Sequence, residues 1–309
     1  MLLGTVTFAD HDEVATLLHQ SLVHWYETRL GQGARFGESP EPFLLFPQVY
    51  EALDSGHSVS VRDESSGALL GVCFLHPRET HVSVGIVATS PAAAGRGVAR
   101  LMMKQAVDLA AAQGLPLRLV SSALNLDSFS LYTKMGFVPH TLYQDVLFNV
   151  PAGGLPGPPP KHADRVRPAT AADAVRIADL ERALQGIRRE ADMHFFLKNE
   201  VGSWKCLVLE NETTGELDGS MVYSVHPAFR MTGPGVARDE TTAAALLWAA
   251  LDAQRGDATV LLAPCPAGEL VRTLYRWGGR NVELHTAQVL GAVPQTKGLA
   301  FPTFLPESA

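Results

Sequence analysis

The stretch PAAAGRGVARLMM, from Pro91 to Met103, decides which fold the rest of the sequence must fit. Two glycines, Gly95 and Gly97, flank an arginine, and an apolar helical pattern starts directly after them. The first turn of a helix leaves backbone N–H groups unpaired and carries partial positive charge, so it binds phosphate readily. Glycines remove side chains that would hold a phosphate away and permit unusual backbone angles. The stretch predicts either a phosphate-binding strand-to-helix turn or a tight turn without a ligand.

Two common phosphate loops are excluded by the residues that follow the glycines. A Walker loop ends in Gly-Lys-Ser/Thr, whereas this chain reads GRGVAR. The dinucleotide fingerprint G-x-G-x-x-G/A is followed by an acidic residue about 20 positions later. Here Arg100 holds the sixth position, and the segment AQGLPLRLV supplies no acid.

Composition excludes several classes of protein. The 309 residues suggest about two domains of ordinary size. Hydrophobic residues at 46% and charged residues at 18% are typical of a globular chain. The formal net charge of −7 and the lack of a basic cluster argue against binding to nucleic acid. Because no basic leader and no stretch of about 20 apolar residues is present, we expect neither secretion nor a membrane span.

The three cysteines, Cys73, Cys206 and Cys265, indicate the compartment. They are odd in number and far apart, which is typical of a reduced cytoplasm rather than of a disulfide framework. None lies in a CxxC pair or near a His pair, so we expect no metal site.

A linker rich in proline and glycine divides the chain. The segment PAGGLPGPPPK, from Pro151 to Lys161, cannot form a helix or a central strand. Its triple proline favours an extended, semi-rigid spacer. We therefore expect a first domain at residues 1–150, a linker at 151–164 and a second domain at 165–309.

The two halves repeat one plan. ESSGALLG (Glu64 to Gly71) and ETTGELDG (Glu212 to Gly219) each predict a hairpin turn followed by a strand and His-Pro. A helical pattern, a glycine, a strand and a Leu-Tyr pair follow in both halves, with Tyr132 and Tyr275 at matching places. The repetition predicts the duplication of one mixed α/β unit.

The first half resembles the GCN5-related N-acetyltransferases. The order is strand, P-x-x-x-G-x-G-x-A, long helix, strand, and then N-x-x-S-x-x-LYxKxGF. The residues that carry the resemblance are Pro91, Gly95, Gly97, Ala99, Asn125, Ser128, Leu131, Tyr132, Lys134, Gly136 and Phe137. It implies an α/β fold of the mixed-sheet type, with two tandem domains of this family whose central mixed β-sheets are flanked by helices. Ala94 departs from the family, which usually has Gln or Arg there.

The resemblance implies that acetyl-CoA, or a related acyl-CoA, is the co-substrate. Its pantetheine arm would pair like a strand with Val87 and Thr89, where two central strands splay apart. Its pyrophosphate would lie on the backbone amides of Gly95, Arg96, Gly97, Val98, Ala99 and Arg100.

The implied reaction is direct transfer of an acyl group to the amine of a small molecule or peptide. Tyr132 is the candidate general acid for the leaving thiolate, because the family positions a hydroxyl near the sulfur there. The alternative for Tyr132 is an aromatic side chain that packs a helix on the sheet. Asn125 either bonds the cofactor arm or caps the following helix, which asparagine does well.

Two residues are candidates for the general base. Glu79 and His81 lie two positions apart, and so on one face of a strand, near the start of the strand HVSVGIVAT. A histidine has a useful ordinary pKa for a base. The alternative is a solvated strand end.

The second half carries the same plan in decayed form. Asp239 and Glu240 stand at the start of its long helix, where they would neutralise the helix end and repel a pyrophosphate. We expect a degenerate copy that walls off the substrate site or forms a homodimer contact. The segment GIRREAD, from Gly186 to Asp192, is interpreted as a solvated helix face, and the alternative is a contact with a charged substrate. The leading hypothesis is a cytoplasmic N-acetyltransferase, and the alternatives are a CoA-binding sensor without activity and an acyltransferase resembling mycothiol synthase.

Overall fold

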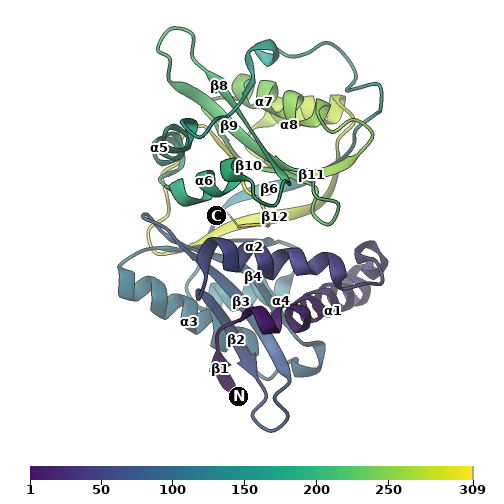
Figure 1. Ribbon diagram of the computed structural model, residues 1–309, viewed down its shortest axis with the longest axis vertical. Coiled ribbons are helices and arrows are strands. Elements are labelled where there is room, and N and C mark those ends of the chain that lie inside the picture. The colour runs from purple at the N-terminus through teal and green to yellow at the C-terminus, as the bar shows by residue number, and fades with distance from the viewer. Residues whose placement is uncertain (308–309) are drawn as a thin grey trace. The chain divides into compact units, whose positions relative to one another are not determined.

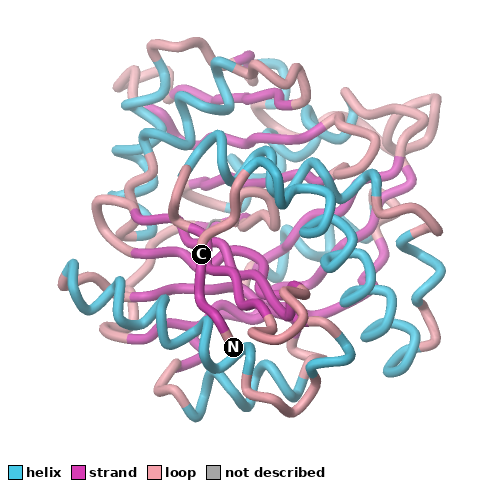
Figure 2. Tube along the Cα trace, turned by 60° about the horizontal axis from the view of Figure 1, so that its bottom comes forward, coloured by secondary structure: helices cyan, strands magenta, loops and turns pink. Residues whose placement is uncertain are grey.

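The computed structural model describes residues 1–307, which form two compact units. The first unit comprises Met1–Pro77, His81–Leu119 and Phe304–Glu307. The second comprises Arg78–Thr80 and Val120–Thr303. In each unit helices lie against strands of a mixed sheet (Figures 1 and 2), so the predicted fold class is confirmed.

The first unit has a sheet in the order β1-β2-β3-β4-β5. All neighbours in it are antiparallel except β4 and β5, which are parallel. The strands are β1 (Leu2–Gly4), β2 (Ser58–Arg62), β3 (Leu69–Pro77), β4 (Val82–Thr89) and β5 (Leu117–Ser122), whose last residues belong to the second unit. The helices are α1 (His11–Leu30), α2 (Leu45–Asp54) and α3 (Val98–Gln113), with short 3-10 turns η1 (Phe8–Asp10), η2 (Gly33–Phe36), η3 (Glu41–Leu44) and η4 (Pro91–Ala93).

The second unit has a sheet in the order β12-β6-β11-β10-β9-β8-β7, and β13 pairs with β10. Its strands are β6 (Val138–Asn149), β7 (Arg167–Pro168), β8 (Trp204–Glu210), β9 (Leu217–Ser224), β10 (Met231–Ala237), β11 (Ala258–Pro264), β12 (Arg280–Leu290) and β13 (Leu299–Phe301). Its helices are α4 (Leu126–Lys134), α5 (Asp173–Gln185), α6 (Glu190–Lys198), α7 (Glu240–Asp252) and α8 (Gly268–Arg276), with the 3-10 turn η5 (Ala163–Arg165).

The two predicted hairpin turns share their stereochemistry. Asp63 accepts hydrogen bonds from the backbone N–H groups of Ser65 and Ser66, at 3.1 and 3.3 Å. In the other turn Asn211 accepts the equivalent bonds at 3.0 and 3.2 Å. Gly67 and Gly215 then adopt φ of 74° and 71°, which a residue with a side chain rarely adopts.

A second pair of glycines explains why each hairpin motif ends in glycine. A Cβ on Gly71 would lie 2.7 Å from Val98 of α3, and one on Gly219 would lie 2.7 Å from Leu246 of α7. Both contacts are too short for real atoms, so each glycine lets the long helix pack closely on its strand. The same device in both units is what a duplicated unit predicts.

Residues 120–150 belong to the second compact unit, although they precede the linker. β6 lies between β11 and β12 and pairs with both in antiparallel register. The compact units therefore divide the chain near residue 120 and not at the predicted boundaries of 150 and 165. Those boundaries stay a prediction about the two halves of the sequence. The segment from Pro151 to Lys161 contains no helix or strand, and Leu155 within it joins the hydrophobic core under α7.

The expectation for the segment GIRREAD is wrong. Arg189 is 2% exposed and donates a short hydrogen bond to Glu181, which is also buried. Asp192 is fully buried and lies 2.7 Å from Nε of Arg78. Burial of these charges depends on mutual pairing, which local sequence does not reveal. Among residues 1–307, no helix is both long enough and apolar enough to cross a membrane.

Candidate acyl-CoA site

The loop before α3 takes the shape that its glycines predict. Gly95 and Gly97 adopt φ of 75° and 78°. A Cβ on either glycine would meet no atom within 4 Å, so the backbone angle rather than crowding explains both residues. Both glycines are exposed at the surface of the first unit.

The N-terminus of α3 offers its backbone amides to solvent. Gly97 is the N-cap and supplies no side-chain hydrogen bond, and the first turn contains no acidic residue. Arg100 is exposed on this turn, while Arg96 is paired with Asp63 at 2.9 Å. No carboxylate in the first turn of α3 therefore neutralises the positive end of the helix dipole, and this favours binding of an anion there.

Among residues 1–307, the strand that precedes this loop has an edge that is unpaired over most of its length. Parallel register with β5 is confined to Val82 and Ser83, after which β4 continues to Thr89. Val87 and Thr89 lie on this continuation and are half-buried. An extended chain can add to such an edge through backbone hydrogen bonds.

β4 also contains a bulge just before Val87. Cys73 of β3 pairs with Val87 and Leu75 pairs with Val84, so two residues of β4, Gly85 and Ile86, face a single residue of β3. A bulge bends its strand and redirects backbone groups. The bulge therefore lies at the far end of the unpaired edge from the glycine loop.

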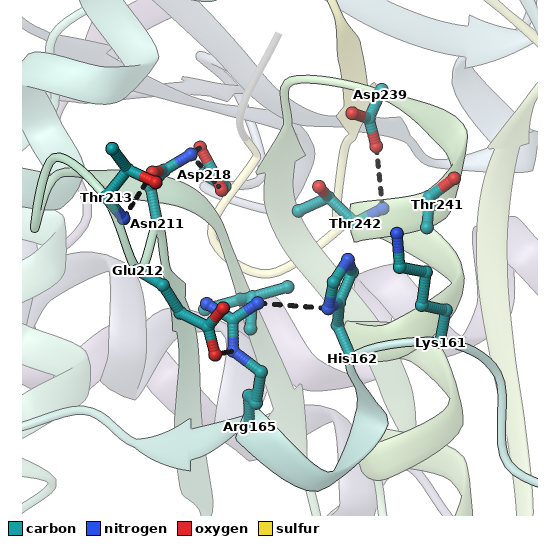
Figure 3. A pocket seen from close by; sticks show the side chains of 11 residues that line it. Lys161, His162, Arg165, Asn211, Glu212, Thr213, Asp218, Asp239, Thr241 and Thr242 are labelled. Carbon is teal, nitrogen blue, oxygen red and sulfur yellow. Dashed lines mark hydrogen bonds and ion pairs between the residues drawn. The ribbon is translucent and has the colours of Figure 1, made fainter.

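In the second unit the N-terminus of the corresponding helix, α7, is capped by one of its own side chains. Asp239 caps α7 by accepting a hydrogen bond from the Thr242 N–H at 2.7 Å, and Glu240 follows it. A cavity of about 330 Å³ at this end of α7 (Figure 3) is bordered by Asp239 and also by Arg165, which is ion-paired with Glu212 at 3.0 Å.

The edge of β10 in the second unit is also occupied. β10 pairs with β11 in parallel only at Met231 and Thr232, as β4 does with β5. Its continuation at Gly235–Ala237 pairs with β13, a strand of the same chain. The second unit thus fills with its own backbone the edge that the first unit leaves unpaired.

Tyr132 lies on α4 and Asn125 is the N-cap directly before this helix, both in the second unit. Asn125 caps this helix by accepting a hydrogen bond from the Ser128 N–H at 3.1 Å, as one of the two alternatives predicted. Tyr132 is 6% exposed, and its ring centroid lies 5.8 Å from that of Phe137. Their roles toward a ligand stay predictions.

The two candidate bases do not share a strand face. β4 begins at Val82, so Glu79 and His81 both precede the strand, and the expectation that placed them on it is wrong. Glu79 is ion-paired with Arg188 at 2.6 Å. His81 is fully buried.

A buried polar cluster in the first unit was not predicted. Tyr50 of α2 donates a hydrogen bond to Glu307, with its hydroxyl 2.8 and 2.7 Å from the two carboxylate oxygens. His76 of β3 lies 3.6 Å from the same carboxylate and 2.5 Å from Asp54. No local signal could have found this cluster, because Glu307 is 257 residues away from Tyr50 in the sequence.

The charges of this cluster shift its pKa values. Burial raises the pKa of the Glu307 carboxyl, although His76 and Tyr50 oppose the shift. Burial, together with the charge of Glu307, raises the pKa of Tyr50 well above its ordinary value. Burial alone would lower the pKa of His76, but hydrogen bonds and charge from Asp54 and Glu307 outweigh it and raise that pKa. Glu307 is thus a carboxylate whose basicity is increased by its site.

Comparison with known proteins shows what the chain is similar to. Residues 16–137 match the model of the Acetyltransferase (GNAT) family. This part of the chain is therefore similar to a GNAT domain, and the chain as a whole shares the fold of solved GNAT proteins, a tandem one among them. No curated protein matches the chain. Among residues 1–307, no group of three potential metal ligands is found.

Several solved structures share this fold over nearly the whole chain. A putative acetyltransferase from Pyrococcus horikoshii is 12% identical with a TM-score of 0.73, covering 99% of this chain and 95% of its own. A GCN5-related N-acetyltransferase from Sphaerobacter thermophilus is 15% identical, with a TM-score of 0.63 and 97% of each chain covered. The tandem GNAT protein from the clavulanic acid biosynthesis pathway, solved without AcCoA, is 15% identical with a TM-score of 0.61, covering 95% of this chain and 99% of its own.

Proposed function

We propose that this protein is an N-acetyltransferase that moves an acetyl group from acetyl-CoA to the primary amine of a small molecule or peptide. The observation that carries the proposal is the N-terminus of α3, which has no side-chain cap and follows Gly95 and Gly97. The strand before it, β4, has an edge that is unpaired among residues 1–307. The first feature suits a pyrophosphate and the second suits an extended pantetheine arm. Only the first unit leaves both features open.

In this proposal the backbone amides of residues 95–100 bind the pyrophosphate, and Val87 and Thr89 pair with the arm. β13 supports the second part, because it pairs with the corresponding stretch of β10 as an extended chain. Arg100 adds positive charge at the helix end, whereas part of the charge of Arg96 is used by Asp63.

The chemistry requires two proton movements. A lysine-like amine, with an ordinary pKa of about 10.4, loses a proton before its lone pair attacks the thioester carbon. The carbon–sulfur bond then breaks, and the CoA thiolate accepts a proton from the hydroxyl of Tyr132, the proposed general acid. The three free cysteines support a reducing compartment, and we propose the cytoplasm.

The alternative function is a CoA-binding sensor without activity, which the buried position of Tyr132 against Phe137 favours. The variant Tyr132→Phe separates the two. In the enzyme it lowers kcat about 100-fold or more, as expected for loss of a general acid, and keeps acetyl-CoA affinity. Tyr275→Phe, at the matching place in the second half, is the control and keeps wild-type turnover.

The test is isothermal titration calorimetry with acetyl-CoA, followed by thiol release with a panel of amines. We expect one acetyl-CoA per chain and amine-dependent thiol release. Two molecules per chain would show that the second unit also binds CoA. Absence of binding would refute the proposed function, and binding of acetyl-CoA without amine-dependent thiol release would favour the sensor.

A further inference from the structure

The carboxylate of Glu307 lies at the bulge of β4. A Cβ on Gly85 would be 3.1 Å from Oε2 of Glu307 and 3.0 Å from Nε2 of His76. The next residue, Ile86, donates its N–H to the Tyr50 hydroxyl at 3.4 Å, and that hydroxyl donates to Glu307. Gly85 therefore leaves room for two titratable side chains directly beside the backbone of β4.

This place corresponds to the acyl end of a bound acyl-CoA. The pyrophosphate is proposed to bind after Thr89, at residues 95–100, and the pantetheine arm runs back along β4 past Val87. Continuing in the same direction, the thioester reaches the bulge at Gly85 and Ile86. Glu307 is 6% exposed there, so its carboxylate is screened from bulk water.

A chain of polar groups leads from Glu307 outward. Oε2 of Glu307 lies 3.6 Å from Nε2 of His76, and Nδ1 of His76 lies 2.5 Å from Asp54. The side chain of His76 is 1% exposed, while that of Asp54, the last residue of α2, is 10% exposed. The order runs from a buried carboxylate through an imidazole to a carboxylate that reaches solvent.

We propose that Glu307 is the general base for the acceptor amine, and that His76 and Asp54 carry the proton from Glu307 to solvent. This inference rests on the proposed function. The attacking ammonium gives one proton to the Glu307 carboxylate, and the freed lone pair forms the nitrogen–carbon bond. Nε2 of His76 accepts the proton from Glu307 when the ring carries its hydrogen on Nδ1 alone, and Nδ1 then releases that hydrogen to Asp54. The buried anion beside the acyl end also selects amines that arrive as cations.

The groups that face Glu307 come from three elements. α2 supplies Tyr50, and β3 supplies His76 and the buried thiol of Cys73, whose pKa burial raises. Asp54 of α2 contacts the other side of His76. β4 supplies the Ser83 hydroxyl, 3.5 Å from the backbone oxygen of Glu307. The net environment raises the pKa of Glu307, which brings a carboxyl closer to the operating pH of a general base.

The experiment measures thiol release from acetyl-CoA with glycinamide, L-lysine and spermidine, continued with the amine that wild type acetylates fastest. Glu307→Gln keeps the size of the side chain and removes the base. We expect kcat to fall about 100-fold or more, the acid limb of the pH profile to disappear, and acetyl-CoA affinity by calorimetry to stay within threefold of wild type. The control is Glu269→Gln, which removes an exposed carboxylate paired only with Arg272 among the ion pairs of residues 1–307.

A second variant distinguishes a catalytic role of Glu307 as a base from a purely structural role, in which Glu307 only holds the C-terminal segment to Tyr50. Tyr50→Phe removes the hydroxyl that donates to Glu307 and stabilises its anion, so the acid limb of the pH profile moves to higher pH. A purely structural role predicts that Tyr50→Phe lowers the stability of the protein without moving the acid limb of the pH profile. An unshifted limb in Tyr50→Phe, or wild-type turnover in Glu307→Gln, overturns the inference and leaves the proposed function intact. Wild type that binds no acetyl-CoA, or acetylates none of the three amines, overturns both.

Discussion

Replacing Gly97 by alanine separates the two explanations of the glycine loop, a phosphate cradle and a plain tight turn. Gly97 has a φ of 78°, and a Cβ there meets no atom within 4 Å. Alanine in the left-handed region costs about 1–2 kcal/mol. Gly67→Ala is the matched control, because Gly67 has a φ of 74°, is equally free of neighbours and lies in a hairpin turn of the same unit.

Both variants therefore lose the same stability but differ in ligand affinity. If the loop cradles the pyrophosphate, the Cβ of residue 97 lies against a phosphate oxygen or turns an amide of α3 away from it. A hydrogen bond from an amide to a charged group contributes about 1.5–3 kcal/mol. A loss of about 2 kcal/mol weakens acetyl-CoA binding roughly 30-fold.

The assay is calorimetric titration of acetyl-CoA into wild type and both variants, with thermal unfolding in parallel. We expect both melting temperatures to fall by a similar few degrees and only Gly97→Ala to lose affinity. Equal affinity of the two variants would refute the phosphate-binding role and leave the glycines as a requirement of the turn.

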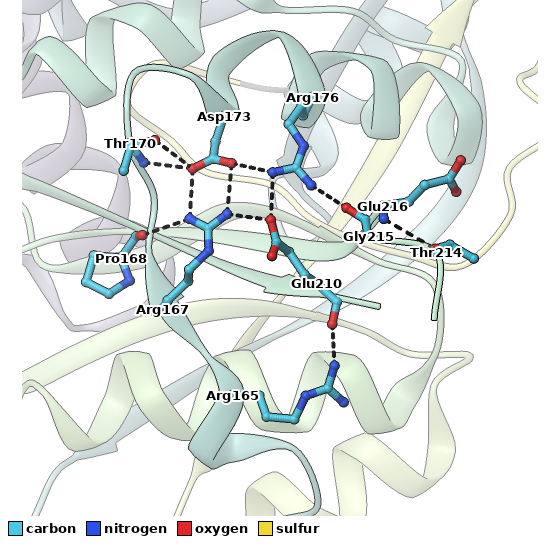
Figure 4. A network of polar contacts seen from close by, with 10 residues as sticks. All are labelled: Arg165, Arg167, Pro168, Thr170, Asp173, Arg176, Glu210, Thr214, Gly215 and Glu216. Carbon is cyan, nitrogen blue, oxygen red and sulfur yellow. Dashed lines mark hydrogen bonds and ion pairs between the residues drawn. The ribbon is translucent and has the colours of Figure 1, made fainter. Parts of the chain in front are cut away.

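Two further predictions concern the second unit. Asp239→Ala removes the cap of α7 and lowers the free energy of unfolding by about 1 kcal/mol in urea titrations. Calorimetry should still find one acetyl-CoA per chain, since β13 continues to occupy β10; a second site would contradict this. Asp173→Asn weakens the network in Figure 4, where Arg167 and Arg176 bond the carboxylate. The hydrogen bond from Arg167 holds the pKa of Asp173 well below its ordinary value, so the stability it provides is present above about pH 4 and lost as pH falls. The difference in stability between wild type and Asp173→Asn, about 2 kcal/mol at pH 7, should shrink toward pH 3, and a constant difference would contradict the assignment.

Local features of the fold followed from the sequence because they depend on near neighbours. The glycine loop, the start of α3 at Val98 and the hairpin glycines each require a particular backbone angle or a helical period. The closed end of α7 was equally predictable, because Asp239 caps the helix three residues from its partner.

Features that depend on distant segments could not be predicted. β13 is three residues long, too short for a periodic signal, yet it occupies the edge of β10. Glu307 reads as an ordinary solvated carboxylate until the chain brings it to Tyr50. Arg189 was expected to be solvated because its pairing with Glu181, eight residues earlier on α5, depends on how two helices pack together.

The position of β6 has a consequence for any rearrangement that separates the two halves of the sequence at the linker. β6 is encoded before the linker, but both of its neighbours, β11 and β12, are encoded after it. A break at the linker would leave β6 with two bare edges and would leave the later strands without the one that joins them. An exchange of either half alone would therefore separate β6 from both of the strands that it pairs with.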